Sequence, residues 1–76
     1  MDVNKELLLK FGESVKKRRK ELNLSQEDLG FEADLHRTYI GMIERGEKNI
    51  TLISMGKIAK ALKTTISKLM VFDHGE

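Results

Sequence analysis

LSQEDLGFEADLHRTYIGMIERG, residues 24–46, is the stretch of sequence that decides the fold. Ser25 is a good helix N-cap, and Asp28 stands three residues later, as in a capping box with Asp in place of the usual Glu. These two residues predict a helix over about 26–33. Residues 34–36 (Asp-Leu-His) then make a tight turn, because Asp tolerates the left-handed conformation that such a turn needs.

A second helix is predicted after the turn, over about 37–45, with Ile40 and Ile43 on its inner side. Gly46 is placed to end this helix. Two short helices joined by a three-residue turn are the helix-turn-helix arrangement, whose core we expect at about residues 25–45.

Gly30 lies in the middle of the first of these two helices, where glycine costs about 1 kcal/mol relative to alanine. A close approach of the second helix accounts for the glycine, since no side chain then stands between the two axes. The alternative is a glycine that is merely tolerated.

Helical spacing also dominates on both sides of this core. The first apolar stripe predicts a helix over about 5–21. Thr51 and Thr65 are suitable N-caps for two further helices, over about 52–62 and 66–71. No segment alternates long enough for a strand, so we expect an all-α fold of five helices. The inward residues expected on the fourth helix are Leu52, Met55, Ile58, Ala59 and Leu62.

The length of 76 residues allows one hydrophobic core, so we expect a single domain over residues 1–76. Apolar residues make up 39% of the chain and charged residues 34%, which favours a compact fold over disorder. Cys is absent, and His36 and His74 lie far apart, so we expect no metal, no cofactor and no catalytic residue. So small a domain has little interior for an enzyme's cleft, and a binding module is expected instead.

The distribution of charge is uneven, although the formal net charge is only +2. Residues 16–20 are five consecutive cations, the acids gather mainly between Glu27 and Glu47, and the chain is basic again from Lys57. A local basic surface attracts a phosphate backbone. The alternative is a solvated helix face, and charge alone leaves both interpretations open.

No segment is predicted to enter a membrane. The longest apolar run, residues 69–72, is far too short to cross a bilayer. The first six residues lack the basic end and the apolar stretch of a secretion signal. We therefore expect a cytoplasmic protein.

Three motifs resemble the Xre/lambda-repressor helix-turn-helix family: LSQEDL at 24–29, LHRTYI at 35–40 and IERG at 43–46. Within that family, residues 35–49 more closely resemble the controller proteins of restriction–modification systems. The family pattern covers roughly residues 11–72, which is nearly the whole chain.

The resemblance implies a sequence-specific regulator of double-stranded DNA whose second helix-turn-helix helix enters the major groove. It places Arg37, Thr38 and Met42 against base edges. Arg offers paired donors to guanine, Thr a hydroxyl and a methyl group, and Met an apolar contact. The alternative for these residues is an exposed helix surface with no partner. Contacts to the DNA backbone, or support of the reading helix, are expected from Ser25, Gln26, His36, Tyr39, Arg45, Lys48 and Asn49.

The five cations at residues 16–20 are expected to have different roles. Arg19 stands where the family carries an arginine that pairs with a glutamate, and Glu44 matches that glutamate. We therefore expect a structural ion pair between the first and third helices. Arg18 occupies a position that many relatives fill with Leu, and its side chain is expected to lie along the edge of the core. The lysines of the run remain solvated or face phosphates.

One domain reads only a few base pairs, so we expect a homodimer on a palindromic operator, with two dimers on adjacent sites as an option. The resemblance implies dimerisation through the C-terminal helices, and part of the apolar set there must also fill the core. The residues expected at the dimer interface are Ile50, Leu52, Ile53, Leu69, Met70, Val71 and Phe72.

The expected role is transcriptional control of the protein's own gene and of the endonuclease gene, with no small-molecule effector. One alternative is a phage-like repressor of the Xre type. Another is an antitoxin or protein-interaction module, which usually needs an extra strand, a flexible arm or a large apolar patch. Binding of single-stranded RNA is disfavoured, because aromatic residues make up only 5% of the chain.

Overall fold

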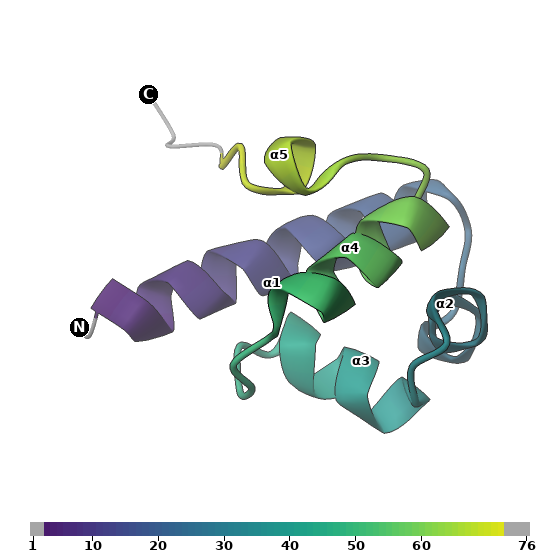
Figure 1. The fold of residues 1–76 in the computed structure, drawn as a ribbon, viewed down its shortest axis with the longest axis horizontal. Helices are drawn as coiled ribbons and strands as arrows, with labels where there is room; N and C mark the ends of the chain where they lie inside the picture. Colours follow the sequence, from purple (N-terminus) through teal and green to yellow (C-terminus); the bar gives the residue numbers. More distant parts are fainter. Residues whose placement is uncertain (1–2, 73–76) are drawn as a thin grey trace.

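The computed structural model describes residues 3–72, and these residues form helices and turns without a strand. The predicted all-α fold of five helices is confirmed (Figure 1). No helix in the described part of the chain has both the length and the apolar character to cross a membrane. The helices are α1 (Val3–Glu21), α2 (Gln26–Ala33), α3 (Arg37–Glu44), α4 (Leu52–Ala61) and α5 (Ile66–Leu69).

The long helix α1 runs across the molecule behind the shorter helix α4 (Figure 1). In the view of Figure 1, α4 crosses in front of α1, α3 lies below and α5 above. Helix α2 packs against both α3 and α4, and α1 packs against α3 and α5. Burial of apolar side chains where these helices meet stabilises the fold. The core consists of Phe11, Val15, Leu29, Ala33, Ile40, Ile43, Ile58, Ala59, Leu62 and Leu69.

The turn between α2 and α3 has the predicted left-handed residue. Asp34 has φ 58° and ψ 45°. A Cβ atom on Gly30 would lie 2.5 Å from the carbonyl oxygen of Leu35 and 3.2 Å from the amide nitrogen of Arg37. Glycine at position 30 therefore permits the close approach of α3 that the sequence predicts. The Leu35 amide also donates a hydrogen bond to the Gly30 carbonyl oxygen (2.8 Å), which fixes the turn.

The sequence placed three helix ends slightly too late. Helices α3, α4 and α5 end at Glu44, Ala61 and Leu69, one to two residues before the predicted ends. Helix ends fray, and such boundaries are the least certain part of a sequence-based assignment.

The assignment of Leu52 to the inward stripe of α4 is wrong, because its side chain is 70% exposed. Leu52 is the first residue of α4. The helix contacts the core from Met55 onward and buries Ile58 and Ala59 there.

Candidate nucleic-acid interface

One side of α3 is buried and the other faces outward. Ile40 and Ile43 are buried in the core, as predicted. Thr38, Met42 and Arg45 are spaced by four and three residues, so they share the opposite face. Arg37 and Thr38 are exposed, whereas Tyr39 and Met42 are half-buried. The first turn of α3 is therefore the part of this helix that is most accessible to a binding partner.

The start of α3 is fixed by His36, which is its N-cap. The Nδ1 atom of His36 accepts a hydrogen bond from the Thr38 amide at 3.0 Å. Sequence reasoning assigned His36 to contact with the DNA backbone or to support of the reading helix, and did not identify it as the N-cap. The position of His36 directly before the predicted helix could have indicated an N-cap, although His is not among the residues most favoured at that position.

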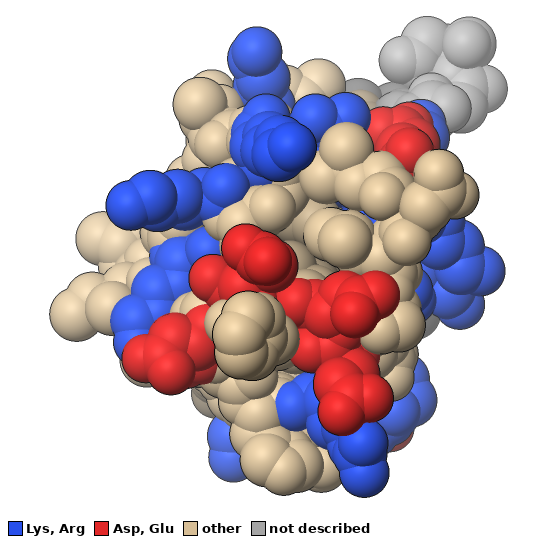
Figure 2. All heavy atoms as spheres, turned by 90° about the vertical axis from the view of Figure 1, so that its right-hand side faces the viewer, with Lys and Arg blue, Asp and Glu red and all other residues tan. Residues whose placement is uncertain are grey.

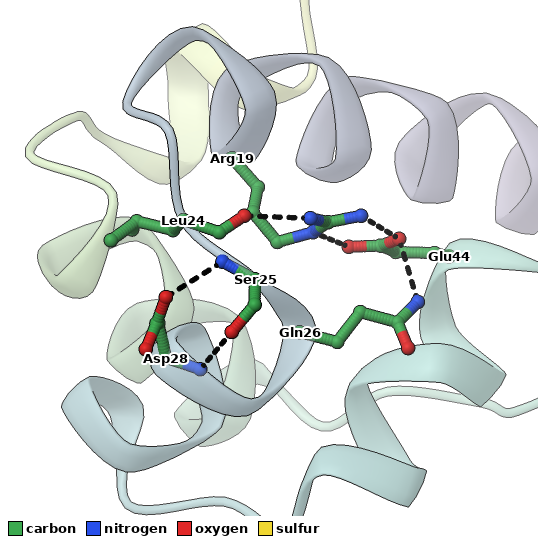
Figure 3. A network of polar contacts seen from close by, with 6 residues as sticks. All are labelled: Arg19, Leu24, Ser25, Gln26, Asp28 and Glu44. Atoms are coloured by element: carbon green, nitrogen blue, oxygen red, sulfur yellow. Dashed lines mark hydrogen bonds and ion pairs between the residues drawn. The ribbon is translucent and has the colours of Figure 1, made fainter.

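The start of α2 has the predicted capping box (Figure 3). The Ser25 hydroxyl accepts a hydrogen bond from the Asp28 amide, and the Ser25 amide donates one to the Asp28 carboxylate, both at 2.9 Å. The hydrogen bond from the Ser25 backbone amide to the carboxylate, with a smaller contribution from the Ser25 side chain, lowers the pKa of Asp28. Ser25 thus orients the first turn of α2, where Gln26 lies.

A buried ion pair joins α1 to α3, as the resemblance implied. The Arg19 guanidinium meets Glu44 through two parallel bonds, Nε to Oε2 at 2.7 Å and Nη2 to Oε1 at 3.0 Å. Its third nitrogen donates to the Leu24 carbonyl oxygen at 2.7 Å. Both charged residues are 8% exposed. The hydrogen bond with Glu44 raises the pKa of Arg19.

Gln26 extends this network to α2 (Figure 3). Its side-chain Nε2 donates a hydrogen bond to Glu44 Oε1 at 3.1 Å. Gly41 lies beside this amide, and a Cβ there would be 3.4 Å from Gln26 Oε1, an ordinary van der Waals contact. We refer to Arg19, Gln26 and Glu44 as the buried network. It ties α1, α2 and α3 together, and no buried side-chain nitrogen or oxygen in the described residues lacks a partner.

Arg37 has a carboxylate neighbour that sequence reasoning missed. Its Nη1 atom lies 3.6 Å from Oε2 of Glu27, and the two side chains are 63% and 74% exposed. The two residues stand ten positions apart on different helices, so no helical spacing connects them. An exposed ion pair is weak. Glu27 therefore lies beside Arg37, and the Arg37 guanidinium stays exposed to solvent.

The loop after α3 carries the remaining residues that were assigned to the DNA backbone. Lys48 and Asn49 are exposed. Arg45 Nε donates a hydrogen bond to Glu47 Oε2 at 3.0 Å, and this contact raises the pKa of Arg45 and lowers that of Glu47. Lys5 Nζ donates to the Gly46 carbonyl oxygen at 2.8 Å, which anchors the loop to the start of α1.

Arg18 lies along the edge of the core, as expected. Its Nε atom donates a hydrogen bond to the carbonyl oxygen of Leu62 at 2.9 Å. This carbonyl belongs to the end of α4, where the last backbone acceptors have no partner within the helix. Arg18 is therefore a structural residue that joins α1 to α4.

The apolar set assigned to the dimer interface divides between the core and the surface. Leu69 is 4% exposed and belongs to the core, so its assignment to an interface is wrong. The helix α5 is a single turn that packs against α1 and α4, and Leu69 is its buried residue. Leu52, Ile53 and Val71 are exposed by 70%, 74% and 74%. The half-buried residues that pack against the core are Ile50, Met70 and Phe72.

Charged side chains are arranged in bands on the face of the molecule that carries α2 (Figure 2). Figure 2 looks at the end of the molecule that carries α2 and shows acidic side chains gathered across its middle, with Lys and Arg above and below. The acids of α2, Glu27, Asp28 and Glu32, are all exposed. A polyanion is repelled by the acidic band and attracted by the basic surface next to it.

The fold and this surface define a helix-turn-helix protein, and the Helix-turn-helix family model matches residues 15–69. Control protein C.BamHI from Bacillus amyloliquefaciens is 49% identical over 65 residues, which are 84% of this chain and 80% of that protein. Control protein C.SmaI from Serratia marcescens is 49% identical over 70 residues, covering 92% of this chain and 79% of that protein.

A solved structure also shows similarity to a control protein of a restriction–modification system. The restriction-modification controller protein C.AhdI from Aeromonas hydrophila superposes with a TM-score of 0.80 at 40% identity, covering 82% of this chain and 94% of that one. The chain belongs to the helix-turn-helix family and, within it, to the control proteins of restriction–modification systems. The family resemblance stated from the sequence is thereby confirmed, and the family is one of regulators, not of enzymes.

Proposed function

We propose that the protein is a homodimeric transcription regulator that binds a palindromic operator and controls its own gene and an endonuclease gene. The observation that carries this proposal is the outward face of α3, with Arg37 and Thr38 exposed on a helix that the buried network holds in place. A reading helix held in place loses little conformational freedom on binding.

In the proposed complex, the first turn of α3 enters the major groove. Arg37 reaches the two acceptors of a guanine, and Thr38 contacts a neighbouring base edge. Met42 lies further along the same helix and offers its apolar side chain to a thymine methyl group. Tyr39 is half-buried and reaches the groove wall.

The DNA backbone is bound on either side of this helix. Gln26 Nε2 uses one hydrogen atom for Glu44 and has a second for a phosphate oxygen. The first backbone amides of α2 favour the same anion. The exposed Arg45, Lys48 and Asn49 approach the phosphates after α3. These contacts set the register of the protein on the duplex and do not read the sequence.

A single α3 reads too short a site to be specific. A two-fold dimer places two copies of α3 about 34 Å apart, one turn of the duplex, and this spacing demands a palindrome. Leu52, Ile53 and Val71 are the exposed members of the interface set and are proposed to cover one another across the two-fold axis. The protein acts in the cytoplasm, where its operator lies, and requires no small-molecule effector.

Selection of bound duplexes from a random pool tests this function. Enrichment of a palindrome with a fixed half-site spacing is expected, and binding of all duplexes alike would exclude sequence-specific regulation. Footprinting of the selected sequence then shows whether a second dimer occupies an adjacent site. The logarithm of affinity should fall linearly with that of salt, by about 0.9 for each phosphate contacted.

Replacement of Arg37 by alanine is expected to weaken binding to the operator by about 1–3 kcal/mol and to relax the preference at one position of each half-site. Lys16→Ala is the control, because Lys16 is an exposed cation on α1 and not a residue of α3. It should reduce affinity slightly and leave the base preference unchanged. Competition binding against operators with single base changes measures both effects, and equal behaviour of the two variants would remove Arg37 from the base-reading residues.

Replacement of Glu27 by glutamine is expected to tighten binding about fivefold at low salt, because a carboxylate near the phosphates is removed and Arg37 is released. The gain should shrink as salt is raised. Glu13→Gln, at an exposed site on α1, is the matched control and should have little effect. Weaker binding by Glu27→Gln would mean that the carboxylate holds Arg37 in its reading position.

A further inference from the structure

Helix α3 is capped by an imidazole, whereas α2, α4 and α5 are capped by hydroxyl groups. The side chains of Ser25, Thr51 and Thr65 each accept a hydrogen bond from a backbone amide in the first turn of their helix. At the start of α3, Nδ1 of His36 accepts one from the amide of Thr38 at 3.0 Å. A hydroxyl oxygen accepts a hydrogen bond at any pH, but a ring nitrogen accepts one only while it carries no proton. The cap of α3 therefore depends on the protonation state of His36.

The hydrogen bond at Nδ1 also determines where the ring proton of His36 lies. A neutral imidazole that accepts at Nδ1 carries its single proton on Nε2. Protonation would put a second N–H group at Nδ1, opposite the N–H group of Thr38 and at the positive end of the α3 dipole. The capped conformation thus binds one proton fewer than the uncapped one, so acid favours the uncapped conformation.

Two charged side chains line a surface hollow of about 250 Å³ together with His36. They are Glu27 from α2 and Arg37 from α3, and Arg37 Nη1 lies 3.6 Å from Glu27 Oε2. Asp34 is the other charged residue of the turn, and it is exposed, as His36 is. Carboxylates and guanidinium groups ordinarily keep their charge between about pH 5 and pH 8, whereas an imidazole changes its charge in this range. Titration in this range therefore acts on the cap through the imidazole.

We propose that His36 is a positioning residue for base reading that acts only as a neutral imidazole, an inference that rests on the regulator proposed above. Arg37 and Thr38 directly follow the cap, and Thr38 supplies the capped amide. Protonation releases this turn and so weakens the preference for the operator. General affinity for DNA changes in the opposite direction, because an imidazolium adds a positive charge close to the phosphates. Acid should therefore separate sequence reading from general affinity.

Affinities for the selected operator and for a random duplex of equal length, measured at constant salt and at about pH 7.5 and about pH 5.5, test this role. In the wild type the ratio of the two affinities should fall at least about fivefold in acid, the typical effect of losing one N-cap. Binding of the random duplex should stay level or become tighter.

Three variants identify the group that titrates. In His36→Asn the ratio should not depend on pH, because Asn is a favoured N-cap whose oxygen does not titrate. His36→Ala should have the low ratio at both pH values. His74→Asn is the control at the second histidine of the chain and should behave as the wild type does.

A second measurement needs no DNA. In NMR spectra of the free protein, the Thr38 amide resonance and the ring resonances of His36 should shift with a common midpoint as the pH falls. In His36→Asn the Thr38 resonance should lose this transition. Circular dichroism should show the same helical signal at both pH values, because the buried network and the apolar core do not involve His36.

The contrary results each overturn the proposal. A wild-type ratio that is constant, or that rises in acid, would mean that reading does not need the neutral cap. The same pH dependence in His36→Asn would assign the effect to another group, and unfolding of the wild type in acid would leave His36 a purely structural role. A Thr38 resonance that does not follow the ring would remove the cap. No preference for any duplex at about pH 7.5 would refute the proposed regulator itself, whereas a preference that ignores pH would refute only the role of His36.

Discussion

Glu44→Ala is expected to lower the free energy of unfolding by about 3–5 kcal/mol, because it leaves the Arg19 guanidinium buried without its counter-charge. Both members of the pair are 8% exposed, and two parallel hydrogen bonds join them. The same substitution removes the acceptor of Gln26, so the side-chain hydrogen bond between α2 and α3 is lost. Small domains are stable by only about 5–15 kcal/mol, so a large fraction of the stability is lost. Urea titration followed by circular dichroism measures the change.

Two further variants identify the cause. Glu47→Ala removes an exposed carboxylate that also contacts an arginine, and its stability should stay close to that of the wild type. Replacing both members of the buried pair, Arg19→Met with Glu44→Leu, should recover part of the loss, because no buried charge is then left alone. Equal stability of Glu44→Ala and the wild type would contradict a structural role for the pair.

Ile53→Asp is expected to lower operator affinity about 100-fold or more, because a charge at the proposed interface separates the two copies and each half-site then binds alone. Ile53 is 74% exposed, so the fold of the monomer should tolerate the change. Sedimentation equilibrium should show a shift from dimer to monomer, and the helical circular-dichroism signal should be retained.

Phe31→Asp is the matched control for this experiment. It places the same charge on another exposed apolar residue, 85% exposed and located on α2, outside the proposed interface. Its oligomeric state should match that of the wild type. A dimeric Ile53→Asp protein would exclude the start of α4 from the interface. Phe72 is a poorer choice for such a test, because it packs against the core and its replacement also affects folding.

The helix-turn-helix core was predictable because its signals are local. The Ser25–Asp28 capping box, the left-handed Asp34 and the close contact at Gly30 each depend on neighbours within a few residues. The Arg19–Glu44 pair is different, because its members lie 25 residues apart. It was expected only from the family resemblance, and no spacing in the sequence indicates it.

Other features depend on packing that a sequence pattern does not contain. Residues 69–72 are four apolar residues in a row, and no pattern within the run tells Leu69, which is buried, from Val71, which is exposed. The contact between Glu27 and Arg37 exists because the turn brings two helix starts together. The orientation of a short helix is decided by its neighbours, and only the assembled fold supplies them.

The buried network, which holds three helices together, is separate from the residues that are proposed to face the operator. Arg37, Thr38 and Met42 make no bond to Arg19, Gln26 or Glu44 in the structure. Exchanging the outward side chains therefore leaves the framework beneath them unchanged. A lineage of such regulators is free to drift from one operator to another by a few surface substitutions, and each intermediate along the way remains a folded protein.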